Sequence, residues 1–175
     1  MNRRQIDTSS DEQYRMRLRD LRDADLEELN ALYEDADVPD EPPEGDARGA
    51  VLAGRGPART SVWKRAARYA PWSGMRLEGT AGAPEQDGIN RLGYGPLTFE
   101  RYGFGAHVER DKDGGALVLD YDVPENPYAL RRLEERLRRL NGVYLGKAYL
   151  RVGGRRVFLH YYAIEPVERE IPIRG

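Results

Sequence analysis

The sequence predicts a mainly antiparallel β domain of the α+β class, namely a small β-barrel or half-barrel with N-terminal helices and one long inserted helix. Short apolar runs after residue 75 alternate with glycine, proline and Asp-Gly breaks, as in a β-meander. Two longer runs, 143–152 and 155–164, flank Gly153-Gly154, which is a two-residue hairpin signal. Because closure removes exposed strand edges, a barrel is favoured over the rival, an open antiparallel sheet backed by helices.

Composition bounds the class of protein. The 175 residues suit one domain, and a formal net charge of −2 gives no electrostatic reason to expect nucleic acid as a partner. The absence of cysteine excludes disulfides, thiolate metal ligands and thiol nucleophiles, and two histidines support a zinc site poorly. No apolar stretch has the length of a membrane span, and the N-terminus does not read as a signal peptide. We therefore expect a cytoplasmic protein without membrane insertion.

The N-terminal quarter predicts helices followed by a linker. Residues 1–22 carry a weak apolar stripe around Leu18 and Leu21 among charged residues, so we expect a helical or disordered extension. Asp23 is expected to cap a second helix. The acidic segment 37–45, which contains three prolines, then predicts a linker.

The body of the domain is expected to begin with a strand over 47–54 and a helix over 61–69. Five short strands follow, over 75–80, 89–94, 97–102, 104–110 and 116–123. The last strand of the final hairpin is largely apolar on both faces, which predicts a strand that is central or covered on both sides. We expect one barrel-like domain over 23–166 and a short tail over 167–175.

The segment after 125 predicts the long inserted helix. Asn126 fits an N-cap, Pro127 fits the first helical position, and Asn141-Gly142 fits a C-terminal stop. Glutamate and arginine side chains four residues apart suit a solvated helix face. The buried stripe expected on this helix is Leu130, Leu133, Leu137 and Leu140.

Tyrosine is concentrated in the predicted strands. Eight of the eleven tyrosines are Tyr94, Tyr102, Tyr121, Tyr128, Tyr144, Tyr149, Tyr161 and Tyr162. Inward-facing tyrosines would line a cavity for a largely apolar ligand with a few oxygens, because the ring is apolar and the hydroxyl needs a partner. The alternative is that tyrosine simply suits half-exposed strand positions. The residues expected to bind the ligand are Asn90, Tyr94, Tyr102, Tyr121, Phe158 and Tyr162.

Three polar residues are candidates for proton transfer: Asp122, Tyr144 and His160. Asp122 ends a strand, where it either faces a pocket or forms a salt bridge at the turn. His160 lies mid-strand, where it is either a base or a hydrogen-bonded core residue. The chain has no P-loop, nucleophile elbow, HExxH or EF-hand pattern, so we expect neither a cofactor nor a metal.

Four segments resemble the recurring words of a family of uncharacterised bacterial proteins found in actinobacteria and proteobacteria. These are PWSGMR at 71–76, GINR at 88–91, LDYDVPENP at 119–127 and GVYLG at 142–146. The resemblance spans about residues 26–164 and implies a lipocalin-like barrel. It implies no catalytic residue, since no activity is established for the family.

Three functions are compatible with these patterns. The first is a cofactor-independent enzyme of the isomerase, cyclase or lyase type, for example in secondary metabolism, that acts on a small hydrophobic molecule in the barrel. The second is a non-catalytic carrier or sensor of a lipophilic ligand. The third is a protein-interaction module in which the N-terminal extension packs on a partner or on a second copy to form a homodimer.

Overall fold

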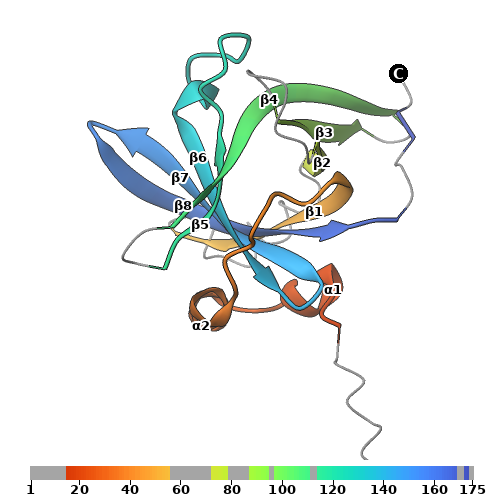
Figure 1. Ribbon diagram of the computed structural model, residues 1–175, viewed down its shortest axis with the longest axis vertical. Helices are drawn as coiled ribbons and strands as arrows, with labels where there is room; N and C mark the ends of the chain where they lie inside the picture. The colour runs from red at the N-terminus through yellow and green to blue at the C-terminus, as the bar shows by residue number, and fades with distance from the viewer. Residues whose placement is uncertain are drawn as a thin grey trace, which may run out of the picture.

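The computed structural model of the protein describes residues 15–55, 72–78, 87–94, 97–110, 114–168 and 172–173. Across these ranges, eight strands form a closed barrel in which sequence neighbours pair antiparallel and the first strand pairs with the last (Figure 1). The strands are β1 (Gly45–Gly54), β2 (Trp72–Leu77), β3 (Gly88–Tyr94), β4 (Leu97–Glu109), β5 (Ala116–Asp120), β6 (Leu133–Leu140), β7 (Val143–Val152) and β8 (Arg155–Pro166). The predicted fold class is confirmed, and the barrel is closed.

Two short helices precede the barrel, α1 (Leu18–Leu21) and α2 (Leu26–Asp35). The N-cap of α2 is Asp25, two residues later than predicted, and its carboxylate accepts hydrogen bonds from the backbone N–H groups of Glu27 and Glu28. Both helices cover the outer face of β7 and β8, where Leu21 and Leu29 pack in one apolar cluster with Tyr161. The prediction that both faces of the last strand are covered is therefore confirmed for residues 161–164, whereas residues 155–157 are exposed.

The prediction of a long inserted helix is wrong. Only Leu130–Arg132 is helical, as a 3₁₀ turn labelled η2, and Leu133–Leu140 is strand β6 between β5 and β7. Leucines four residues apart fit one face of a strand as well as a helix, and pairing on both sides satisfies the backbone of β6. Asn126 anchors a loop instead of capping a helix, because its amide donates to the carbonyls of Gly103 and Tyr121 at 2.7 and 2.9 Å.

The remaining differences concern element boundaries. The strands expected over 97–102 and 104–110 are one strand, β4, with a bulge at Tyr102, since Arg101 pairs with Asn90 and Gly103 pairs with Ile89. The strand expected over 47–54 is confirmed as β1, and the hairpin of β7 and β8 is confirmed with Val152 opposite Arg155. The helix expected over 61–69 and most of the extension over 1–22 lie outside the described residues.

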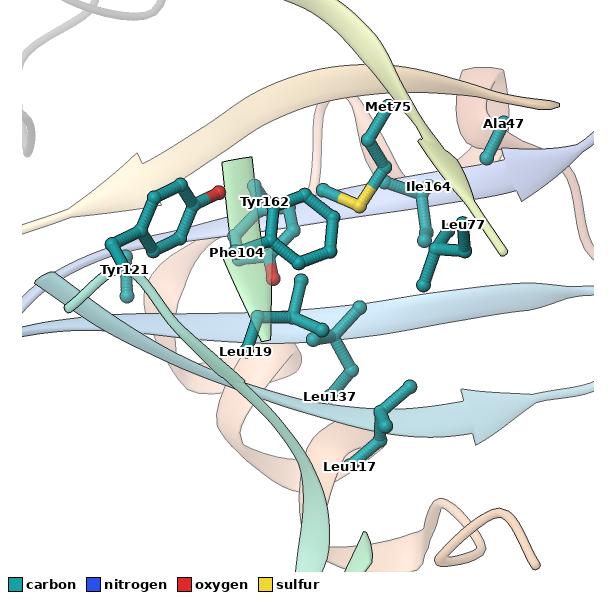
Figure 2. Packing of buried hydrophobic residues seen from close by; sticks show 11 residues of the cluster. Ala47, Met75, Leu77, Phe104, Leu117, Leu119, Tyr121, Leu137, Tyr162 and Ile164 are labelled. Atoms are coloured by element: carbon teal, nitrogen blue, oxygen red, sulfur yellow. The ribbon is translucent and has the colours of Figure 1, made fainter. Parts of the chain in front are cut away.

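The barrel interior differs between its two ends. One end is filled by aliphatic side chains that include Leu77, Leu137 and Ile164, and aromatic side chains gather toward the other (Figure 2). That second end is where β1, β3 and β5 finish and where β2 and β6 begin. It holds the polar side chains described next.

Candidate functional site

A cavity of about 230 Å³ lies inside this second end of the barrel. It is lined by Val51, Trp72, Asn90, Leu92, Tyr102, Tyr121, Leu130, Leu133, Glu135, His160 and Tyr162. An engineered cavity of about 150 Å³ holds benzene, so by proportion this one holds a molecule of roughly nine or ten carbon atoms. An apolar wall with a few converging polar groups is typical of a small-molecule site.

A chain of hydrogen bonds crosses the cavity wall from β2 to β6. The Trp72 indole N–H donates to the Asn90 carbonyl oxygen at 2.7 Å, and the Asn90 amide donates to the Tyr121 hydroxyl oxygen at 3.0 Å. The Asn90 amide also donates to the Tyr102 backbone carbonyl at 3.0 Å. Tyr121 accepts from Asn90, and its own proton has two acceptors within reach, Glu135 Oε2 at 3.2 Å and the Asn90 carbonyl oxygen at 3.4 Å. Asn90 therefore holds the Tyr121 hydroxyl within reach of Glu135.

Glu135 is a buried carboxyl group in this wall, with 8% of the residue exposed. Its neighbour Glu134 forms an ion pair with Arg156 at 2.7 Å, whereas no cation among the described residues pairs with Glu135. Burial raises the pKa of Glu135 to about 7, and the nearby Tyr162 and Tyr121 hydroxyls act in the opposite direction. Both protonation states are populated at neutral pH, which suits a group that takes up and returns a proton.

Tyr162 lies beside Glu135 and is held from two sides. Its ring packs over Gly146 of β7, where a Cβ would lie 2.4 Å from the ring, and it meets the Trp72 ring edge-on at 5.6 Å. Its buried hydroxyl contacts the Glu135 carboxyl group, without the geometry of a good hydrogen bond. Burial, followed by the Glu135 carboxylate, raises the pKa of Tyr162 well above its ordinary value, so the hydroxyl stays protonated.

His160 lines the same cavity and is neutral at pH 7. Burial lowers the pKa of its imidazole to about 4. A neutral imidazole offers one donor and one acceptor but no positive charge. His160 can therefore orient a polar ligand atom without attracting an anion.

Tyr102 has a strained backbone at the cavity wall. Its φ is +65°, a value rare for a residue with a bulky side chain, and it is the additional residue of the β4 bulge. The hydrogen bond from Asn90 to its carbonyl holds this geometry. Such strain persists where the surroundings fix it, and it clusters at binding sites.

Five of the residues predicted from the sequence come together here, namely Asn90, Tyr102, Tyr121, His160 and Tyr162. Asp122 does not join them: it is exposed and forms an ion pair with Arg131 at 2.7 Å, as the alternative interpretation had it. Tyr144 lies near the opposite end of the barrel, in a groove with Asp37 and Arg139.

Two further predicted ligand-binding residues lie elsewhere. Phe158 is on the outer face, packed on Tyr161 at 5.3 Å between ring centroids. A bulge in β8 places it there, because Ala148 pairs with His160 while Tyr149 pairs with Phe158, which breaks the alternation. Tyr94 pairs with Leu97 through its backbone, and its side chain lies outside the described part of the structure.

Glu135 and Trp72 are the lining residues with polar groups that sequence reasoning missed. Glu135 fell within the expected solvated helix, where a glutamate followed by an arginine four residues later signals an exposed pair. Read as a strand, the alternation of Leu133, Glu135 and Leu137 places Glu135 among inward leucines. A single carboxylate between two leucines on one strand face was the signal that could have identified Glu135 as a site residue.

Comparison of the chain with family models, curated proteins and solved structures finds no match. The closed barrel of eight described strands is compatible with the lipocalin-like fold that the sequence resemblance implies. No helix within the described ranges is long and apolar enough to cross a membrane. Those same ranges contain no group of three or more metal-ligating side chains.

Proposed function

We propose that the protein binds a small, largely apolar molecule inside the barrel and acts on it by transferring a proton through Glu135. The observation that carries the proposal is a buried carboxyl group with a pKa of about 7 in the wall of an apolar cavity. The hydrogen bond from Tyr121 supports it, since Tyr121 is itself oriented by Asn90.

The reaction that fits this arrangement is a cofactor-independent isomerisation. Glu135 as a carboxylate takes a proton from one carbon of the bound molecule and returns it to another, so no redox partner is required. Asp122 and Tyr144 lie outside the cavity, and we therefore assign the proton transfer to Glu135.

Native mass spectrometry of protein purified from its own host tests the binding. The wild-type protein is expected to retain a small apolar molecule, and Leu133→Trp, which fills the cavity, is expected to lose it. An empty wild-type protein that also binds no apolar probe would contradict the proposal.

Incubating the recovered molecule with the protein in D₂O tests the catalysis. Wild type is expected to incorporate deuterium, and Glu135→Gln to slow this by about 100-fold or more, the usual contribution of a positioned acid or base. Glu134→Gln is the matched control, because Glu134 is the adjacent carboxylate and pairs with Arg156 away from the cavity. Equal incorporation by wild type and Glu135→Gln would refute the catalytic role.

A carrier or sensor is the second candidate. The apolar wall of the cavity favours it, because small barrels commonly hold one ligand without changing it. A carrier would bind its ligand equally tightly in Glu135→Gln, and neither protein would incorporate deuterium into it.

A further inference from the structure

We infer that the substrate is a compact, neutral ketone whose carbonyl oxygen accepts a hydrogen bond from Tyr162. This inference rests on the proposed function and names the class of molecule on which Glu135 acts. Three features of the described residues support it: the place of Tyr162 in the cavity lining, the absence of a lysine or arginine from that lining, and the contact of Tyr162 with Glu135.

The Tyr162 hydroxyl is the donor in the cavity wall that we assign to a ligand oxygen. The Trp72 N–H and both Asn90 amide functions are already hydrogen-bonded within the wall, and Tyr121 is engaged with Asn90 and Glu135. The buried hydroxyl of Tyr162 contacts Glu135, but without the geometry of a good hydrogen bond. A ligand oxygen could accept a better-aligned hydrogen bond from it, which is worth about 1 kcal/mol.

The charges of the wall select a neutral ligand. The described lining residues include no lysine or arginine, and His160 is uncharged at neutral pH. A carboxylate or phosphate ligand would face the Glu135 carboxylate in an apolar site without any compensating cation. A neutral oxygen compound avoids this repulsion, and its hydrocarbon part meets Leu92, Leu130 and Leu133.

The adjacency of Tyr162 and Glu135 turns this binding mode into chemistry. A carbonyl oxygen held by Tyr162 places the neighbouring α-carbon beside Glu135. The carboxylate then removes a proton from that carbon: the C–H bond breaks, its electrons form a C=C bond, and the carbonyl π electrons move to the oxygen. The resulting enolate oxygen is stabilised by the Tyr162 hydroxyl. The protonated Glu135 returns the proton to the α-carbon or, in an unsaturated ketone, to the γ-carbon.

Three bicyclic probes of similar size separate the oxygen contact from simple cavity filling. These are tetralin, which has no oxygen, 2-tetralone, which is an enolisable ketone, and 2-naphthol, a planar analogue of its enol. Calorimetric titration of wild type is expected to show 2-naphthol binding at least about tenfold more tightly than tetralin, the discrimination expected of a buried hydrogen bond. Tyr162→Phe is expected to lose this preference while it still binds tetralin.

Tyr161→Phe is the matched control, since Tyr161 is the next residue on β8 but lies on the outer face and donates to Asn30 at 2.6 Å. It is expected to keep the preference for 2-naphthol. Deuterium exchange at C1 of 2-tetralone, followed by NMR in D₂O against the uncatalysed rate, is expected to slow by about 100-fold in Tyr162→Phe. Circular dichroism melting confirms that each variant is folded.

The outcomes separate the two proposals. If wild type binds tetralin and 2-naphthol equally, or if Tyr162→Phe changes neither the preference nor the exchange rate, the ketone inference is overturned while ligand binding stands. If none of the three probes binds, the proposed function itself fails. Binding of 2-tetralone without any exchange would overturn proton transfer through Glu135.

Discussion

Replacing Glu135 by glutamine is expected to stabilise the protein at neutral and alkaline pH, because burial in the native state disfavours the charged form of this carboxyl group. Burial raises its pKa from 4.5 to about 7. Below pH 4.5 the group is protonated in both states and has no effect on stability. As the pH rises toward 7, the unfolded chain releases the proton while the native state retains it, so stability falls and stays low above pH 7. The difference in pKa between the unfolded and native states corresponds to a loss of about 3 kcal/mol in the free energy of unfolding.

Thermal unfolding of wild type and Glu135→Gln at pH 4 and pH 8 measures this effect. For a domain of this size, about 3 kcal/mol corresponds to an increase in Tm of roughly 6–12 °C at pH 8, with little difference at pH 4. Glutamine keeps an oxygen that can accept the hydrogen bond from Tyr121. Glu134→Gln, which loses an ion pair with Arg156, should show no such gain. A pH-independent difference, or a less stable Glu135→Gln at pH 8, would refute the reasoning.

Three further perturbations test the cavity wall. Gly146→Ala is expected to lower both Tm and affinity for an apolar probe, since the new Cβ would lie 2.4 Å from the Tyr162 ring, and unchanged binding by calorimetry would contradict this packing. His160→Phe is expected to reduce the loss of stability as the pH falls from 6.5 to 4. In this range the unfolded chain binds a proton at His160, whereas the buried imidazole, with its pKa of about 4, does not. Parallel stability curves for the two proteins would count against this. Tyr102→Gly relieves a positive φ and is expected to leave Tm within a few degrees of wild type while it weakens probe binding, whereas a large fall in Tm would show that the ring supports the barrel.

Local signals that act over a few residues predicted the hairpins and most strands. Gly153-Gly154 adopts positive φ at both positions, which a two-residue turn between twisted strands requires, so the register of β7 and β8 could be predicted from the sequence. The short apolar runs of β1 and β5, each bounded by glycine, were equally legible.

The identity of β6 depended on contacts that are distant in the sequence. Its leucines fit both periodicities, and its charged residues find partners far along the chain. Arg136 pairs with Glu109, and Arg138 donates to the carbonyls of Gly115 and Tyr33. These partners make a buried, charged strand stable, and the spacing of Leu133 and Leu137 alone could not reveal them. Because Glu135 lies on β6, the error about the helix concealed the central residue of the site.

The contrast between paired and unpaired buried charges is the strongest structural reason to assign a function to the barrel interior. Behind the wall, Arg91 and Asp46 form a buried ion pair at 2.6 Å, and Glu134 pairs with Arg156. The chain therefore supplies cations where burial of a carboxylate serves the fold. Glu135 is also buried, yet it faces the cavity without a cation within the described chain, next to the hydroxyl of Tyr162. A leucine at position 135 would pack there without the pH-dependent penalty, so the carboxyl group lowers the stability of the fold at neutral pH. Such a penalty is retained where the group acts on a ligand, and the pH dependence of unfolding measures its size independently of any substrate.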